Sequence, residues 1–125
     1  MMAGLTTLEL IAAPGFHQRL GAATDSLMRR LQAAAAAADI PLSTNHVCGM
    51  FGFFFTRERN VDTFAKVMAC DVDRFRRFFH AMLDAGVYLA PSAFEAGFLS
   101  AAHTPSDIDA TVAAAERIFP RLHAA

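Results

Sequence analysis

The chain has 125 residues, of which 54% are hydrophobic and 18% are charged, and its formal net charge is −1. This length suits a single domain with its own core, and the apolar composition excludes a disordered segment. The 11 basic and 12 acidic residues form no basic stripe, so nucleic acid is not an expected partner. Apolar runs are interrupted before the roughly 18 residues of a membrane span, and the start MMAGLTTLEL lacks a signal-peptide pattern. We therefore expect a cytoplasmic chain that does not bind a membrane.

Two helices are predicted before the first strand. The first covers about the first dozen residues, with Leu5 and Leu8 on one side, and it is broken by Pro14-Gly15. The second runs from about residue 16 to residue 38, where apolar side chains recur at steps of three and four. The apolar positions of the second helix are Phe16, Leu20, Ala23, Leu27, Leu31, Ala34 and Ala38.

The middle of the chain is predicted to continue with strands and then helices. Residues 45–56 contain HVCGMFGFFFT, whose aromatic residues and two glycines favour two short strands or one bent strand. Asn60 is expected to cap a short helix, and Asp71 to cap a longer one that ends at Gly86. The short helix would carry Phe64, Val67 and Met68, and the longer one Phe75, Phe78 or Phe79, and Met82.

The last third is predicted to hold two more strands and a helix. Residues 87–90 and 97–100 read as strands, with Pro91-Ser92 forcing a turn between them. Thr104 followed by Pro105 predicts a helix start. The fold class is therefore α+β, with a small, mainly antiparallel sheet of three or four strands and helices on one face. The buried stripe of the last helix would be Ile108, Val112, Ala115, Phe119 and Leu122.

Several kinds of active site are absent from the sequence. No G-x-S-x-G elbow and no glycine-rich phosphate motif occurs. His46, Cys48, Cys70 and His103 lack the spacing of a common zinc site, so we interpret them as packed or exposed residues and predict no metal. Lys66 is the only lysine and reads as a solvated surface residue.

The runs NHVCGMFGFFFT and VMACDVDRFRRFFHAMLDAGVYLAPSAFEAGFLSAAHTPSDIDAT carry a resemblance. In this order they resemble the carboxyl-terminal part of glutamate-1-semialdehyde 2,1-aminomutase, a pyridoxal-phosphate enzyme of the class III aminotransferase type. The likeness extends from the first helix nearly to the last residue. It implies that residues 1–40 are lead-in helices from the junction with a large domain and that residues 41–125 are the carboxyl-terminal α+β small domain. One departure is Cys48, where glycine is expected in many relatives.

The resemblance implies an isomerase that converts glutamate-1-semialdehyde to 5-aminolevulinate in tetrapyrrole biosynthesis. It also implies a homodimer and a large domain, outside this chain, that holds the cofactor through a Schiff-base lysine. We therefore expect a truncated domain with no catalytic residue of its own, which binds no pyridoxal phosphate and is inactive alone. The alternative is a stand-alone α+β module for binding or dimerisation.

Glu95 is the residue of most interest, because it is the one carboxylate in a long apolar run. By the resemblance, aminotransferases of related fold carry an arginine here that grips the substrate carboxylate, whereas the aminomutases carry glutamate. Glu95 would then pair with an arginine of the amino-terminal region and act in substrate binding or gating, and Ser92 would help to shape the same loop. The alternative for Glu95 is a solvated loop residue without a role.

Overall fold

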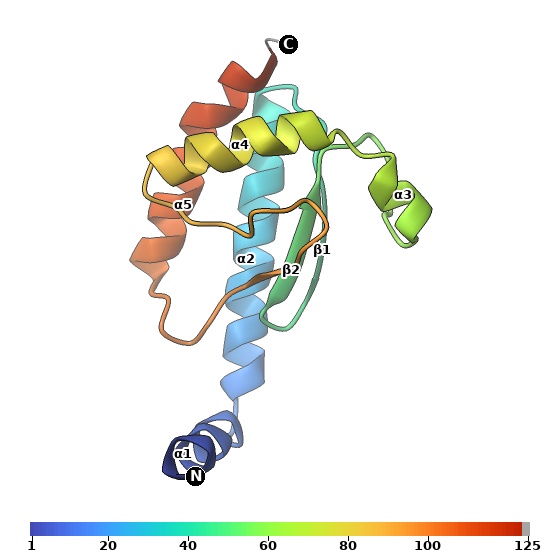
Figure 1. Cartoon of the computed structure of the whole chain (residues 1–125). Helices are drawn as coiled ribbons and strands as arrows, with labels where there is room; N and C mark the ends of the chain where they lie inside the picture. The colour runs from blue at the N-terminus through green and yellow to red at the C-terminus, as the bar shows by residue number, and fades with distance from the viewer. Residues whose placement is uncertain (124–125) are drawn as a thin grey trace.

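Helices cover one face of a three-stranded antiparallel sheet in the computed structural model, which describes residues 1–123 (Figure 1). The strands lie in the order β1-β2-β3, and α2, α4 and α5 form the helical layer. Within residues 1–123 no helix is both long enough and apolar enough to cross a bilayer. The elements are α1 (Met2–Ile11), α2 (Phe16–Ala37), β1 (Ser43–Val47), β2 (Met50–Phe54), α3 (Phe64–Met68), α4 (Val72–Asp84), β3 (Gly97–Phe98), α5 (Pro105–Ile118) and the 3-10 helix η1 (Phe119–His123).

The register of the sheet sends alternate residues of β2 to opposite faces. Val47 of β1 lies opposite Met50, and Met50 in turn lies opposite Phe98 of β3. Phe51 and Phe53 point toward the helices and are buried, whereas Met50 is exposed. The predicted hairpin within residues 45–56 is thus present as two strands joined by a tight turn.

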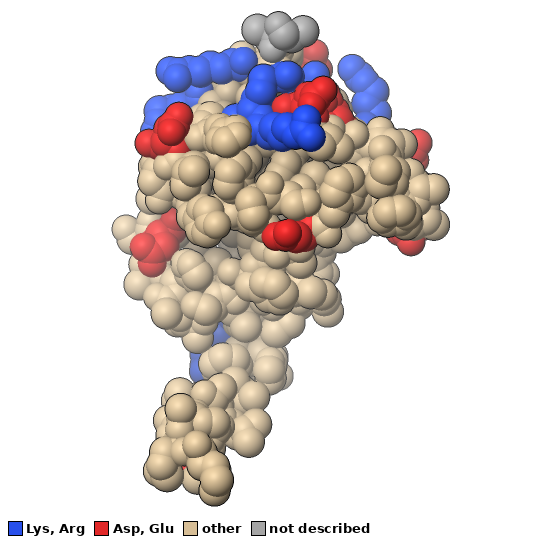
Figure 2. Space-filling model, in the orientation of Figure 1, with Lys and Arg blue, Asp and Glu red and all other residues tan. Residues whose placement is uncertain are grey.

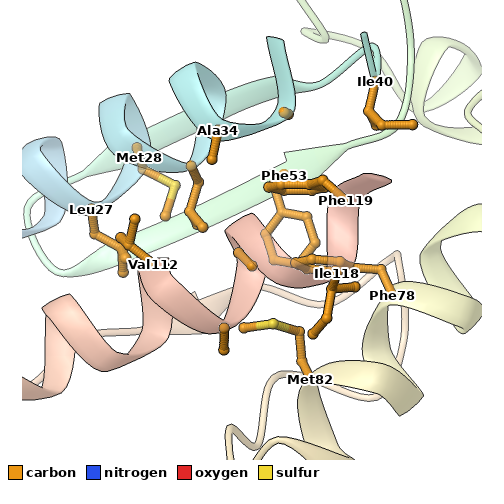
Figure 3. Packing of buried hydrophobic residues seen from close by; sticks show 14 of the residues in the cluster. Leu27, Met28, Ala34, Ile40, Phe53, Phe78, Met82, Val112, Ile118 and Phe119 are labelled. Atoms are coloured by element: carbon orange, nitrogen blue, oxygen red, sulfur yellow. The ribbon is translucent and has the colours of Figure 1, made fainter. Parts of the chain in front are cut away.

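An aromatic cluster fills the space between the sheet and the helices (Figure 3). The Phe78 ring of α4 stacks on the Phe119 ring at a centroid distance of 5.0 Å and meets the Phe53 ring edge-on at 5.6 Å. Such pairs stabilise a core beyond the surface that they bury. Both candidates on α4, Phe78 and Phe79, are buried, and the predicted stripe of α5 is confirmed at Ile108, Val112, Ala115, Phe119 and Leu122.

Helix α2 belongs to the same core, because it packs against both α5 and the sheet. Leu27 and Leu31 are buried as expected. The helix ends in a Schellman motif, in which Asp39 takes a left-handed φ of 52° and the Ile40 N–H donates to the Ala35 carbonyl at 2.8 Å. The division of the chain at residue 40 stays a prediction.

The predicted cap of α3 is wrong. Thr63, not Asn60, caps this helix, and its hydroxyl accepts the Lys66 N–H. The chain before it is held extended beside β1, because the Asn45 amide donates to the Val61 carbonyl at 2.6 Å and the Val61 side chain is buried. Helix α3 therefore starts three residues later than predicted. Its Phe64 side chain is exposed.

The strand predicted at residues 87–90 is also absent, and the next strand is only Gly97–Phe98. Gly86 ends α4 with a φ of 86°, as expected, and the Val87 N–H then donates to the Met82 carbonyl at 2.8 Å. That bond uses the first donor of the segment, and Pro91 has no donor to offer at the other end. Residues 87–90 consequently run past the core without pairing with a strand.

Candidate functional site

An open groove lies on the face of the sheet opposite the helices. Its volume is about 400 Å³, and it is bounded by β1, β2, α3 and residues 93–96. Gly52 has no side chain, and it forms part of the lining between Met50 and Phe54 of the same strand. Val47, Phe64 and Phe94 line the groove and are exposed, so its walls are apolar surface in contact with water.

Glu95 and Ser92 meet in one turn at the rim of this groove. The Ser92 carbonyl accepts the Glu95 N–H at 3.1 Å, and the Ser92 hydroxyl accepts the Phe94 N–H at 3.2 Å. Ser92 thereby fixes the backbone that presents Glu95. The Glu95 side chain lines the groove, is exposed, and has no ion-pair partner among residues 1–123. Its role in substrate binding stays a prediction.

The same loop, residues 87–96, carries the only tyrosine of the chain. The Tyr88 ring is 75% exposed and meets the Phe79 ring of α4 edge-on, at a centroid distance of 6.2 Å. The loop is therefore attached to the helical layer at its start and reaches the groove at its end.

Lys66 is held in a local network on α3. Its ammonium group donates to the Asp62 carboxylate at 2.7 Å and to the Asn60 carbonyl at 3.0 Å. The hydrogen bond with Asp62 raises the pKa of Lys66 and, in turn, lowers the pKa of Asp62. Lys66 therefore stays protonated, and a protonated amine is no nucleophile.

The four histidine and cysteine residues considered for a metal site lie in separate contacts. Nε2 of His46 lies 3.7 Å from the Asp25 carboxylate. The Cys48 thiol lies 3.7 Å from Nδ1 of His17, and the Cys70 thiol donates to the Lys66 carbonyl at 3.2 Å. Burial raises the pKa of the Cys70 thiol. Nδ1 of His103 accepts the Ser100 N–H at 3.0 Å. Among the residues that the structure describes, no three His, Cys, Asp or Glu side chains gather as metal ligands would.

Cys48 stands where the resemblance predicts glycine. It occupies the turn between β1 and β2 with a φ of 49°, a left-handed conformation that favours glycine. The neighbouring Gly49 is needed for a different reason, because a Cβ there would lie 2.7 Å from the Leu99 carbonyl.

Sequence reasoning missed the groove itself, whose walls are mostly apolar residues that point away from the core. A signal was present in MFGFF, which is apolar on both faces of a strand instead of alternating with polar residues. The exposed lining residues that were not singled out for a site are Val47, Met50, Phe64 and Phe94.

Comparisons with known proteins show which solved structures share this fold. No family model matches the chain. It superposes on an omega-transaminase from Sphaerobacter thermophilus with a TM-score of 0.78 and 19% identity, over 97% of this chain and 27% of that one. For the FumI protein of Sphingopyxis sp. MTA144, in its pyridoxal-phosphate internal aldimine form, the TM-score is 0.74 and the identity 26%, over 97% and 26% of the two chains. A transaminase with pyridoxal phosphate bound gives 0.70 and 13%, over 90% and 24%.

The chain has an aminotransferase-like fold. It spans about a quarter of the length of each of these three proteins. The aminotransferase-like fold thus covers nearly the whole chain, while most of each related structure has no counterpart in it.

The residues of this chain do not fit pyridoxal phosphate, the cofactor of two of those structures. An internal aldimine requires a lysine whose amine is free to react, and Lys66 is the only lysine. Its ammonium group is instead paired with Asp62 and protonated. The groove beside it holds one carboxylate and no lysine or arginine that could bind a phosphate. We therefore assign no step of cofactor chemistry to this chain.

Proposed function

We propose that this chain is the small domain of a glutamate-1-semialdehyde 2,1-aminomutase and acts together with a large domain that binds pyridoxal phosphate. The whole enzyme would convert glutamate-1-semialdehyde to 5-aminolevulinate for tetrapyrrole synthesis, and this chain alone would be inactive. The single observation that carries the proposal is the coincidence of two features over one stretch. The run GVYLAPSAFEAGF resembles the aminomutases, and it forms the loop of an aminotransferase-like fold that presents Glu95.

Glu95 would set the specificity of the assembled enzyme. A carboxylate at this position repels the carboxylate of a substrate, whereas it can pair with an arginine of the amino-terminal region. The exposed side chain, which has no ion-pair partner among residues 1–123, supports this role, because a partner from outside would find it accessible. Ser92 would act as a positioning residue through the two hydrogen bonds of the turn.

A chimaeric enzyme tests the proposal. This chain would replace the small domain of an active aminomutase, and 5-aminolevulinate formation from glutamate-1-semialdehyde would be measured. We expect activity in the chimaera and none in the chain alone. Replacing Glu95→Gln should lower kcat/KM by about 10- to 100-fold, which corresponds to the roughly 1.5–3 kcal/mol of a hydrogen bond to a charged group.

Matched controls separate this role from a general effect of charge. Glu116→Gln on α5 removes an exposed carboxylate far along the chain and should leave kcat/KM unchanged. A chimaera that folds and binds pyridoxal phosphate but forms no 5-aminolevulinate would contradict the proposal. For the chain alone, a borohydride-reducible aldimine absorbance that survives desalting at one equivalent would contradict the predicted lack of cofactor binding.

The second candidate function is a stand-alone module for binding or dimerisation. The exposed apolar groove favours it, because contiguous apolar surface of this kind is typical of interaction sites. An inactive chimaera together with specific self-association of the chain would support this second function over the first.

A further inference from the structure

Helix α1 has apolar surface on every side and no buried residue. Leu5, Leu8 and Leu10 are 51, 62 and 61% exposed. A helix with this composition is normally enclosed by other elements. Figure 1 shows α1 beyond the end of α2, away from the sheet, so its own domain leaves it uncovered. In Figure 2 this end of the molecule is almost free of charged surface, whereas Lys and Arg gather at the opposite end.

The groove on the outer sheet face is the second uncovered apolar surface, and it continues across the sheet. Met50 in the groove lies opposite Phe98 of β3, and Phe98 is 70% exposed. The charged lining is limited to Glu95, apart from the titratable imidazole of His46. The groove therefore offers an apolar floor with a single carboxylate at its rim.

Helix α1 carries regularly spaced apolar side chains. Met1, Leu5 and Leu8 stand at positions i, i+4 and i+7, so they form one row along α1. This is the spacing by which a helix lays apolar anchors into a groove. The body of α1 would remain above the groove while these side chains enter it.

The amino end of α1 and the rim of the groove carry opposite charges. Helix α1 has no side-chain cap and no acidic residue in its first turn, so its amino end keeps the positive partial charge of the helix dipole. Glu95 supplies the opposite charge at the groove rim. The one charged side chain of α1, Glu9, lies near the other end of the helix, on the order of 10 Å away along the axis. This arrangement orients the amino end of α1 toward Glu95.

We propose that the chain, with no cofactor-binding domain attached, forms a two-fold dimer in which α1 of each copy lies in the groove of the other. Reciprocal exchange uses the same pair of surfaces twice and closes the assembly. The exposed parts of Phe64, Phe94 and Phe98 leave on the order of 400 Å² of aromatic surface per copy in water. With the leucines of α1, two copies reach the roughly 1,200–2,000 Å² of a stable interface.

Sedimentation of the full chain over a concentration series tests the dimer. We expect a reversible dimer whose dissociation constant rises at least about tenfold in Leu8→Asp and in Phe64→Asp. Glu95→Gln should raise it only about two- to fivefold, as expected for the loss of one charge at a helix end. Leu83→Asp on α4 is the matched control, since Leu83 is also exposed but lies in neither surface, and it should leave the constant unchanged.

Cross-linking of mixed copies tests which surfaces meet. In a Cys48→Gly, Cys70→Ala background, Leu5→Cys on one copy should form a disulfide with Val47→Cys on another, and far-ultraviolet circular dichroism should show that both fold. A monomer at all concentrations, open oligomers larger than two, a dimer that none of the variants weakens, or disulfides only between two Leu5→Cys copies would each overturn the proposal. No cofactor or substrate is present, so these outcomes are independent of the proposed aminomutase function.

Discussion

The two faces of the sheet are made of similar residues but differ in what covers them. On the helical face, Phe51 and Phe53 are 7 and 9% exposed. On the open face, Val47, Met50 and Phe98 are 61, 42 and 70% exposed. Met50 comes directly before the buried Phe51 along β2, and it pairs with Val47 and with Phe98. Along β2 the side chains alternate between the two faces of the sheet but do not alternate between polar and apolar.

This difference separates the residues that make the fold from the residues that await a partner. Antiparallel sheets with one face in water normally place polar side chains on that face. An open face with apolar side chains is instead typical of an interaction surface. The core under the helices should therefore carry the stability of the domain, and the open face should contribute little to it.

Truncating one ring on each face gives the largest expected contrast. Phe78→Ala removes a buried ring that contacts Phe53, Phe55 and Phe119, and it should lower the free energy of unfolding by about 3–5 kcal/mol. Phe98→Ala on the open face should change it by no more than about 0.5 kcal/mol. Urea titration at a concentration where the chain is monomeric measures both. Equal losses would show that the open face is part of the folded core.

A smaller contrast comes from adding one methyl group at a glycine. At Gly97 a new Cβ would lie 2.5 Å from the ring of Phe51, so this buried ring would have to shift. Gly97→Ala should therefore cost about 1–3 kcal/mol. Gly4 in α1 has no atom within 4 Å of that position, so Gly4→Ala should be neutral or stabilise by up to about 1 kcal/mol. A loss of stability in Gly4→Ala would mean that α1 is packed more closely than its exposure indicates.

The smallest effect concerns the fully exposed cap of α5. The Thr104 N–H and hydroxyl hold the pKa of Asp107 below its ordinary value. Because the folded-state pKa is the lower one, the carboxylate stabilises the fold above its unfolded pKa of about 3.9, and this contribution is lost as the pH falls through the folded pKa. Unfolding midpoints measured between about pH 5 and pH 2 should fall less in Asp107→Asn than in the unchanged chain. Parallel curves would show that the cap does not couple to protonation.

The helices could be predicted from the sequence because their signals are local. Apolar residues at steps of three and four located α2 and α5, and Asp71, Gly86 and Thr104 marked helix ends by hydrogen bonds within a few residues. These contacts do not depend on the rest of the chain. The α+β class followed from the order of such elements.

The errors arose where distant residues decide the outcome. Asn60 and Thr63 are both good caps, and contacts with a distant strand, such as the hydrogen bond from Asn45 to the Val61 carbonyl, hold the intervening chain. Residues 87–90 have the composition of a strand. A Schellman motif at the end of α4 uses the Val87 N–H, however, and the segment is left unpaired. Short apolar runs indicate extended backbone and do not specify a neighbour.

The candidate site was foreseen only in part for the same reason. Glu95 stood out by its charge in an apolar run, and Ser92 by its place in a turn. The groove beside them requires two strands, α3 and the loop to come together, and no local pattern encodes that meeting. Its apolar walls resemble core residues in the sequence, since exposure is a property of the fold and not of the residue type.

The position of Tyr88 gives the molecule a built-in optical probe. The chain has no tryptophan and this one tyrosine, so fluorescence excited at wavelengths that phenylalanine does not absorb comes from a single ring at the start of the Glu95 loop, in contact with Phe79. Quenching and anisotropy of that emission can follow the loop directly in the unlabelled protein. Any partner that covers the loop will change the signal without a dye or a mutation.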